Sequence, residues 1–370
     1  KILWEDNTMS RGEQFLLMNK DVIVLVFSIE RDIFSVNYVT EHIETRFLLP
    51  RDLRDLCRWS EERYIRIYRY GMQSFLEAAG ISGIEKLIEI TNCISLKDTY
   101  WVKKSNSKKT WNTVSPYRNP LDESIIDYSL TGKLTEKITT GSPDFATDGK
   151  FPKFWKRHPS GLYLYKSGIT SPRSNGNEPY SELYAYEIAT RLGIEAVKYE
   201  LTFYRGHLFS KCKCLTNEKI GLMSYQDLHN TITCDFAELL QSVEGKEKKQ
   251  IIDMLLLDYI TCNVDRHYGN IGVFIENDTN RILGFTPLYD HNLSCLSYYK
   301  ENENLDSHIS NLRVKDGRTW GELYSLIDSE YVREKLQCLE NPLEMEEKRS
   351  FIVDKMIQYQ AKIVQNKKHN

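Results

Sequence analysis

The sequence predicts an α+β fold with a small β-rich lobe, a helical C-terminal lobe and an N-terminal accessory subdomain. Runs of β-branched and aromatic residues alternate with turn residues between about 130 and 215, whereas the chain beyond residue 230 is mainly helical. A polar stretch with two prolines, residues 104–123, separates the first part from the rest. The parts that we expect are residues 1–125, 126–215 and 216–370.

The accessory part begins with a predicted β-meander in residues 15–39, where apolar runs are separated by short polar turns. The pattern becomes helical over residues 53–87, and residues 95–103 are expected to be extended. In the second part, residues 139–157 (TTGSPDFATDGKFPKFWKR) are expected to form a loop. The strands and helix expected after it are the strand 161–168, the helix 181–193 and the strands 198–205 and 207–214.

The helical part contains one predicted hairpin among its helices. The helices expected there cover residues 236–245, 248–260, 321–339 and about 344–367. The apolar stripe of the last one, at Ile352, Met356, Tyr359 and Ile363, indicates core packing and not a cofactor site. Charged loops at the junction of the two lobes place the expected site there.

Composition excludes several classes of function. The apolar fraction of 41% and the charged fraction of 27% are ordinary for a globular protein. A net charge of −3 gives no footprint for direct nucleic-acid binding. No run of about 18 apolar residues predicts a membrane span. The eight cysteines lie singly except for one C-x-C, which is weak support for zinc and fits a reducing compartment, so we expect a cytoplasmic protein.

The chemistry is concentrated around the hairpin in residues 263–292. IGVFIE and RILGFTP flank the turn at residues 277–280, and a pairing of Glu276 with Arg281 would place Ile271 opposite Thr286. The hairpin then brings Asn270 close to Asp290, and Asp265 lies on the loop that enters the same end. Turn preference alone also gathers Asp and Asn at hairpin ends. The spacing nevertheless fits a kinase catalytic loop, with Asp265 as base and with Asn270 and Asp290 as ligands of a divalent cation.

A lysine and a glutamate complete the pattern. Lys166 ends the strand GLYLYKSG, a position where most lysines are solvated edge charges. In the helix that follows, Glu182 shares a face with Ala185 and Ala189, whereas Glu187 points elsewhere. Glu182 is therefore predicted to face inward and to hold Lys166 against nucleotide phosphates.

Together these motifs, NVDRHYGN, PLYDHN and NEPYSELYAYEIATRLGI, resemble the HipA-like serine/threonine kinases. The resemblance is specific over the last 210 residues. It implies a two-lobed protein-kinase-like fold and transfer of phosphate from ATP, with Mg²⁺, to a protein serine or threonine. It also implies a role as the toxin of a toxin–antitoxin pair, with a cognate antitoxin as partner.

By the same resemblance Asp265 is the catalytic base, Asn270 and Asp290 bind Mg²⁺, and Lys166 binds phosphate with Glu182 as its partner. Phe209, Ser210 and Lys211 are expected to form the interlobe hinge that binds adenine, and Gly149 is expected to lie in the phosphate-binding loop. Autophosphorylation is expected in that loop, at Ser142 or Thr147, with loss of activity afterwards.

The sequence departs from conventional kinases in three ways. It has no G-x-G-x-x-G, it has YDHN where many kinases have DFG, and Arg266 and His267 follow the catalytic Asp instead of preceding it. The order D-R-H-x-x-N is shared with phosphoinositide kinases. Two alternatives therefore stay open: a kinase with a lipid or small-molecule acceptor, and a nucleotide-binding pseudokinase that acts as an interaction module.

Overall fold

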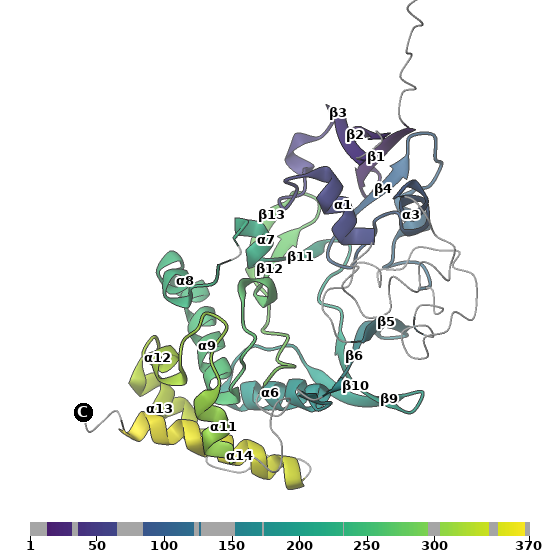
Figure 1. The fold of residues 1–370 in the computed structure, drawn as a ribbon. Coiled ribbons are helices and arrows are strands. Elements are labelled where there is room, and N and C mark those ends of the chain that lie inside the picture. The colour runs from purple at the N-terminus through teal and green to yellow at the C-terminus, as the bar shows by residue number, and fades with distance from the viewer. Residues whose placement is uncertain are drawn as a thin grey trace, which may run out of the picture. The chain divides into compact units, whose positions relative to one another are not determined.

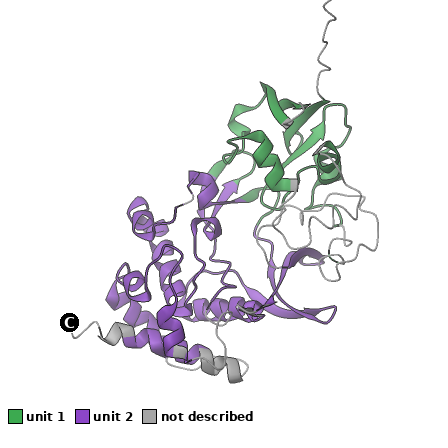
Figure 2. Ribbon diagram, in the orientation of Figure 1, with its two compact units in different colours: residues 1–149, 216–221, 276–281 green, residues 150–215, 222–275, 282–370 purple. Residues whose placement is uncertain are grey.

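The protein is described from a computed structural model, in two compact units (Figure 2). Unit 1 contains residues 1–149, 216–221 and 276–281, and unit 2 contains residues 150–215, 222–275 and 282–370. The residues that the structure describes are 13–31, 36–64, 84–121, 126, 152–171, 174–231, 233–294, 304–339 and 347–366. The division into residues 1–125, 126–215 and 216–370 stays a prediction.

Unit 1 is built on a four-stranded antiparallel sheet in the order β3-β2-β1-β4 (Figure 1). The strands are β1 (Glu13–Asn19), β2 (Val22–Arg31), β3 (Val36–Ile43) and β4 (Tyr100–Lys104). The predicted β-meander is thereby confirmed. Phe15 and Phe27 face each other across β1 and β2 with ring centroids 5.6 Å apart, and both are fully buried, so aromatic packing fixes this register.

Short helices cover this sheet: η1 (Arg46–Leu48), α1 (Leu56–Tyr64), α3 (Ile84–Thr91) and α4 (Trp111–Val114). Trp59 of α1 is buried in the same hydrophobic core as Phe15 and Phe27. Arg63 lies 3.9 Å from the centroid of the Trp59 ring and donates to Asp98 at 3.0 Å. The buried charge is thus balanced by a carboxylate and by an aromatic face.

The hairpin turn at residues 277–280 also belongs to unit 1. Asn19 Nδ2 donates to the carbonyl of Asn277 at 2.7 Å, and Asn280 Nδ2 donates to the carbonyl of Leu49 at 2.6 Å. Arg51 Nε donates to the carbonyl of Asn280 at 2.7 Å. Asn277 Nδ2 donates to the carbonyl of Asn217 at 3.1 Å, so the side chains of both turn asparagines hold the turn in unit 1 and do not take part in the candidate site.

Unit 2 begins with a four-stranded antiparallel sheet in the order β5-β6-β10-β9. Its strands are β5 (Lys153–His158), β6 (Gly161–Ser167), β9 (Tyr199–Tyr204) and β10 (His207–Lys213), and a two-stranded ribbon, β7 (Thr170–Ser171) and β8 (Ser174–Asn175), follows β6. The expectation of a loop up to residue 157 is wrong from Lys153 onward. Phe154 is fully buried and stacks on Tyr165 of β6 at 4.9 Å, which makes this segment an inner-facing strand.

The helix α6 (Glu178–Leu192) packs against β9 and β10 (Figure 1). It carries Pro179 in its first turn, where the missing amide proton costs no hydrogen bond. It ends as predicted at Gly193, whose φ of 69° suits glycine, and the Gly193 amide bonds back into the last turn. This frame sets the position of Glu182 relative to the sheet.

The rest of unit 2 is mainly helical and packs around α9 (Gly245–Thr261), with α6 also in this core. The other helices are α7 (Tyr225–His229), α8 (Phe236–Ser242), α11 (Leu305–Asn311), α12 (Trp320–Tyr324), α13 (Ser329–Gln337) and α14 (Glu347–Asn366). The single helix predicted over residues 321–339 is two helices, because Asp328 accepts hydrogen bonds from Glu330 and Tyr331 and so begins a new one. Met356 of α14 is buried as its stripe predicts, while the side chains of Ile352 and Ile363 lie outside the described residues.

The predicted hairpin is formed by β12 (Gly272–Glu276) and β13 (Arg281–Phe285), and β11 (Ile220–Ser224) pairs with β12 on its other side. The register of the hairpin formed by β12 and β13 differs from the predicted register at the end away from the turn. The Thr286 amide donates to the carbonyl of Gly272 at 2.9 Å, one residue away from the expected partner Ile271. Gly284 of β13 has a φ of 117°, a conformation that only glycine adopts easily, so the strand is irregular at this residue.

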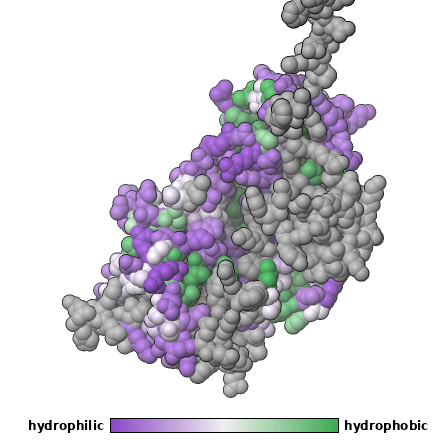
Figure 3. All heavy atoms as spheres, viewed as in Figure 1, coloured by the Kyte–Doolittle hydropathy of each residue, from purple (hydrophilic) through white to green (hydrophobic). Residues whose placement is uncertain are grey.

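The described surface on the face drawn in Figure 3 is mostly hydrophilic, with small hydrophobic areas. The large apolar side chains of unit 2 that are exposed in the described part of the chain are Phe203, Ile282 and Leu283. Within the same ranges no helix combines the length and apolar character needed to cross a membrane.

Candidate active site

The loop with Asp265 leaves the buried helix α9 at a left-handed cap. Cys262 has a φ of 52°, and its amide points back to the carbonyls of Asp258 and Tyr259. Gln360 of α14 donates to the carbonyl of Tyr259 at 2.7 Å, and the Tyr259 hydroxyl donates to the carbonyl of Gln360 at 2.7 Å. The bonds to the carbonyls of Asp258 and Tyr259 satisfy acceptors that the end of α9 leaves without partners, so the loop begins from a fixed point.

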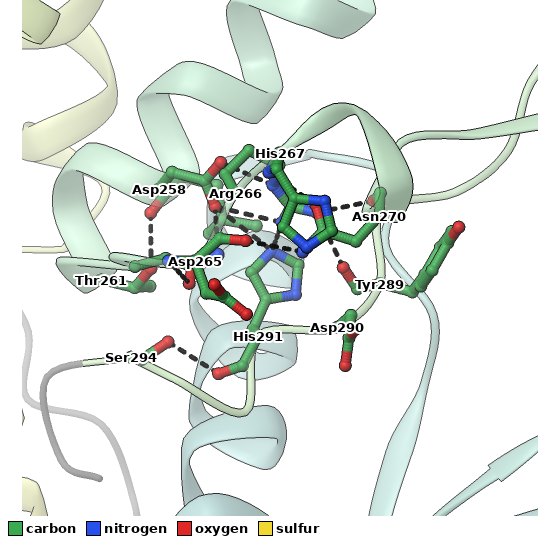
Figure 4. Close-up of polar contacts among 12 residues, drawn as sticks. Asp258, Thr261, Asp265, Arg266, His267, Asn270, Tyr289, Asp290, His291 and Ser294 are labelled. Atoms are coloured by element: carbon green, nitrogen blue, oxygen red, sulfur yellow. Dashed lines mark hydrogen bonds and ion pairs between the residues drawn. The ribbon is translucent and has the colours of Figure 1, made fainter. Parts of the chain in front are cut away.

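Arg266 forms the centre of a buried polar cluster (Figure 4). Its Nε donates to Asp258 Oδ2 at 2.8 Å and its Nη2 donates to Asp258 Oδ1 at 3.1 Å. The side chains of Arg266 and Asp258 are each only 1% exposed. A buried arginine paired in this two-pronged way is held rigidly, and removal of either partner would leave a charge without compensation.

The same guanidinium joins two segments of chain. Arg266 Nη1 donates to the carbonyl of Asn270 at 2.9 Å and to the carbonyl of Tyr289 at 3.0 Å. Its Nη2 lies 2.9 Å from His291 Nε2. Burial, and then the neighbouring charge of Arg266, hold the pKa of His291 well below its usual range, so this imidazole is neutral and accepts from Arg266. Arg266 therefore sets the position of Asn270 and of the residues on both sides of Asp290.

Asn270 is fixed by its own side chain as well. Its Nδ2 donates to the carbonyl of Asp265 at 2.8 Å, and its Oδ1 accepts from the amide of His267 at 3.0 Å. The loop is thus closed on itself, and Asp265 is held at one end of it with its side chain 30% exposed. An acceptor could approach this carboxylate from solvent.

His267 packs tightly inside this loop. The Gly269 amide donates to His267 Nδ1 at 3.0 Å, which assigns the proton of a neutral ring to Nε2. Burial is the main cause that lowers the pKa of His267. A Cβ at residue 269 would lie 2.7 Å from His267 Cε1, so the close approach requires glycine.

Lys166 of β6 binds two carboxylates. Its Nζ donates to Glu182 Oε1 of α6 at 2.6 Å and to Asp290 Oδ1 at 2.8 Å. Glu182 is fully buried, which confirms its predicted inward direction, and its other oxygen accepts a hydrogen bond from Ser210 of β10. The sheet, the helix α6 and the segment at Asp290 therefore meet at one ammonium group.

The electrostatics of this cluster keep both charged forms in place. Desolvation alone would raise the pKa of Asp290, but Lys166 and Lys153 outweigh it and hold that pKa well below its usual range. Lys153, which pairs with Lys166 across β5 and β6, is itself buried. Burial would lower the pKa of Lys166, yet the carboxylates of Asp290 and Glu182 raise it well above the usual value. At neutral pH the site thus contains a charged ammonium beside an ionised carboxylate.

Asp290 has the geometry and the charge for a metal ligand. Its φ of 63° lies in the left-handed region, which aspartate adopts more readily than most residues other than glycine. Oδ1 faces Lys166, and the side chain is 36% exposed. Carboxylate and carboxamide oxygens, such as those of Asp290 and Asn270, are ligands that Mg²⁺ accepts when phosphates and water complete its shell. Asn270 Oδ1 accepts from the His267 amide at 3.0 Å and from Arg266 Nη1 at 3.4 Å, so metal binding by Asn270 requires one of these bonds to be released. Among the described residues no group of three or more His, Cys, Asp or Glu could hold a metal by itself.

The adenine-binding assignment needs correction. Phe209, Ser210 and Lys211 lie inside β10, between β6 and β9, and each is paired with both neighbouring strands. Their backbone groups are therefore engaged in the sheet, and the side chains of Phe209 and Ser210 are buried. Residues 209–211 cannot offer the free amide and carbonyl that a hinge needs. Gly149, Ser142 and Thr147 lie outside the described residues.

Three residues near the site were not predicted from the sequence. Asp258 could have been suspected, because it is a lone carboxylate in the apolar run LLLDYI. Lys153 lies near the end of residues 139–157, which the sequence predicts as a loop, and it begins β5. Lys315, whose Nζ is 3.1 Å from Asp265 Oδ1, is 50 residues away in sequence and carries no local pattern.

Comparison with known proteins bears on the fold. No protein-family model and no curated protein sequence matches the chain. HipA of Shewanella oneidensis MR-1, solved as a toxin–antitoxin complex with HipB and its operator DNA, is similar over 95% of this chain and 97% of that one, with a TM-score of 0.54 and 12% identity. The proinflammatory kinase CtkA of Helicobacter pylori is similar over 60% of this chain and 92% of that one, with a TM-score of 0.45 and 17% identity. The predicted α+β, two-lobed protein-kinase-like fold is confirmed, and the resemblance to HipA holds at the level of the fold.

Proposed function

We propose that this protein transfers the γ-phosphoryl group of ATP, with Mg²⁺, to a serine or threonine hydroxyl of a protein. The contact that supports this most strongly is the double ion pair of Lys166 with Glu182 and Asp290. An ammonium fixed between a helix and a metal-binding aspartate is the arrangement that phosphoryl-transfer enzymes use to orient nucleotide phosphates.

Asp265 is the proposed base. It takes the proton of the acceptor hydroxyl while that oxygen attacks the γ-phosphorus, and the bond between the γ-phosphorus and the β–γ bridging oxygen breaks to release ADP. Its partial exposure leaves room for an acceptor, and the hydrogen bond between Asn270 and the Asp265 carbonyl fixes the backbone.

Asn270 and Asp290 are the proposed metal ligands. When bound, Mg²⁺ neutralises the charge of the phosphates and of the transferring group. Arg266 contributes indirectly, since it holds the backbone at Asn270 and at Tyr289 and so keeps the two ligands at one place. Lys166 binds phosphate oxygens and keeps Asp290 oriented.

The adenine contact is proposed one step further along the chain. β10 ends at Lys213, and the Cys214 amide still donates to the carbonyl of Leu162 at 2.8 Å. The pairings of β10 with β6 and with β9 both end before Leu215, which still belongs to unit 2. The backbone of Cys214–Leu215 therefore replaces residues 209–211 as the candidate for binding the adenine edge.

The phosphate-binding loop that includes Gly149 remains part of the proposal, and so does its modification. We expect Ser142 or Thr147 to become autophosphorylated. Activity should then fall, because a dianion beside the nucleotide phosphates would repel them. Mass spectrometry after incubation with ATP and Mg²⁺ tests this. An active enzyme with no phosphate between residues 139 and 147 would contradict it.

A protein partner is proposed as well. The similar HipA structure contains HipB and operator DNA, and a cognate antitoxin is proposed for this chain on that basis. Co-expression with the product of a neighbouring reading frame should yield a stable complex and reduced kinase activity. Direct DNA binding by this chain is not part of the proposal.

The test of the function is ligand stabilisation measured with and without Mg²⁺. ATP with Mg²⁺ should raise the melting temperature by several degrees more than ATP with EDTA, because binding to the folded state stabilises it. In Asp290→Asn this difference should largely disappear. A pseudokinase would show ATP binding that does not depend on Mg²⁺, and it would transfer no phosphate. A kinase with a lipid or small-molecule acceptor would show the Mg²⁺ dependence, but labelled ATP would label no protein.

A further inference from the structure

Lys315 forms an ion pair with the proposed catalytic base. Its Nζ lies 3.1 Å from Asp265 Oδ1, and its side chain is 54% exposed. An exposed pair of this kind contributes only about 0–1 kcal/mol to stability. The contact is therefore too weak to serve as structural support, and it can exchange easily when another partner approaches Asp265.

The backbone that carries Lys315 is held in a tight turn. The Val314 amide donates to the carbonyl of Arg318 at 2.9 Å, and the Gly317 amide donates to the carbonyl of Val314 at 2.8 Å. Gly317 has a φ of 88°, which glycine adopts without strain. Val314 is buried beneath the turn in the helical core. The lysine stem thus starts from a defined position although its ammonium group is exposed.

The turn is also tied to the loop of Asp265. Arg318 is paired with Asp316 and donates from Nη2 to Asp235 Oδ1 at 3.1 Å. The carbonyl of the same Asp235 accepts from the hydroxyl of Tyr268 at 2.6 Å, and Tyr268 lies in the loop between Asp265 and Asn270. Two connections therefore join the turn and the loop: the direct pair of Lys315 with Asp265, and the chain through Asp235.

We propose that Lys315 supplies a cation that first pairs with the Asp265 carboxylate and then compensates the negative charge of the transferring phosphoryl group. This role rests on the proposed function. In the free protein the Lys315 ammonium pairs with the Asp265 carboxylate. As Asp265 takes the hydroxyl proton, the carboxylate loses its charge while negative charge moves onto the transferring phosphoryl group and ADP. Released from its partner, the ammonium then faces the phosphoryl oxygens. The proton count is unchanged, because Lys315 neither gives nor takes a proton.

The contacts of the other cations favour Lys315 for this role on the side of the acceptor. Lys166 is engaged with Glu182 and Asp290, and Arg266 is buried against Asp258. Both positive groups are directed to other carboxylates. Lys315 is a cation with an exposed ammonium that contacts the proposed base directly, so it can reach an acceptor bound there.

The test compares Lys315→Met, Lys315→Arg and the control Arg313→Met with the wild type in steady-state transfer from ATP with Mg²⁺. Arg313 lies on the same segment and donates from Nη1 to the carbonyls of Ser310 and Leu312 at 2.8 Å. Lys315→Met should lower kcat about 10- to 100-fold, since a group that stabilises developing charge acts on the transition state. The KM for ATP should stay within about twofold, because ground-state ATP binding does not use this group.

Lys315→Arg should recover most of the lost kcat and Arg313→Met should match the wild type, a pattern that a structural role would not produce. An unchanged kcat in Lys315→Met overturns the inference while leaving the proposed function intact. A raised kcat also overturns it and shows that the ion pair blocks the base. A wild type that transfers no phosphate from ATP overturns the proposed function and, with it, the inference.

Discussion

Unit 2 contains two ionic clusters that look alike in composition but differ in their partners. Around Arg266, the guanidinium and the Asp258 carboxylate are almost completely buried and bonded to each other and to the surrounding chain. Around Lys166, the ammonium is also buried, but Asp290 is 36% exposed and only its Oδ1 bonds to Lys166 among the described contacts.

This difference in exposure distinguishes a cluster that supports the structure from a cluster that can bind a ligand. A buried ion pair whose hydrogen bonds are all made can hold a loop but cannot bind a ligand without losing them. A carboxylate that is kept ionised and partly open to solvent can accept a metal or a phosphate-bound cation. Under the proposed function, the Arg266 cluster therefore positions the site, and the Lys166 cluster binds the phosphates and the metal. We therefore expect substitutions in the Arg266 cluster to lower the free energy of unfolding, and substitutions in the Lys166 cluster to lower nucleotide binding or phosphate transfer.

The largest expected effect is on folding, from Arg266→Met. The change leaves Asp258 buried without a cation, which costs about 3–5 kcal/mol of the free energy of unfolding. The matched control is Arg58→Met, since Arg58 pairs with Glu62 at the surface and its loss should cost less than about 1 kcal/mol. Urea denaturation of both variants measures the difference. Similar losses in the two variants would mean that the Arg266 cluster is not structural support.

A second comparison concerns the two aspartates. Asp290→Asn should weaken nucleotide binding in the presence of Mg²⁺, because it removes a charged metal ligand and leaves Lys166 less compensated. Asp265→Asn should abolish transfer but leave nucleotide affinity within about threefold, since Asp265 has no contact with the Lys166 cluster among the described bonds. Isothermal titration with ATP and Mg²⁺ measures both affinities. Equal losses would contradict the division of roles.

Two lysines on neighbouring strands give the third comparison. Lys166→Ala should reduce transfer by about 10²-fold or more, because Lys166 bonds to Glu182 and Asp290. Lys153→Ala, on the paired strand, should reduce it less, since Lys153 acts on Asp290 through charge at longer range. Initial rates at saturating ATP decide the order. If Lys153 is the more important residue, the phosphate-binding role belongs to β5 and not to β6.

The smallest expected effect is that of a single methyl group. Gly269→Ala places a Cβ against the His267 ring and should shift the loop that holds Asp265, which lowers kcat about tenfold. Gly321→Ala in α12 is the matched control, because a Cβ there meets no atom within 4 Å. Rates and melting temperatures of the two variants measure the effect. A fully active Gly269→Ala would show that the loop tolerates displacement of His267.

Local patterns explain which features could be predicted from the sequence. The direction of Glu182 follows from helix periodicity, and the approach of Asn270 to Asp290 follows from a hairpin, so both are available from short stretches of sequence. The register at Thr286 was off by one residue, an offset that no local pattern in the sequence specifies.

Other features depend on contacts between distant segments. The hinge that the resemblance assigns to residues 209–211 falls inside the strand 207–214 that the sequence itself predicts, and the structure has that strand as β10. Lys315 could not be predicted, since its relation to Asp265 exists only through the packing of the 314–318 turn against the helical core. Sequence patterns locate the ends of elements poorly and long-range side-chain pairs hardly at all.

The most direct measurement of the central claim is transfer of labelled phosphate from γ-labelled ATP by the wild type and by Asp265→Asn, with Mg²⁺ and a cell lysate as the source of acceptors. We expect labelled serine or threonine in protein with the wild type, no labelled protein with Asp265→Asn, and equal ATP binding by both. Phosphate transfer by Asp265→Asn at the wild-type rate, or no transfer by a wild type that binds ATP and Mg²⁺, would contradict the account.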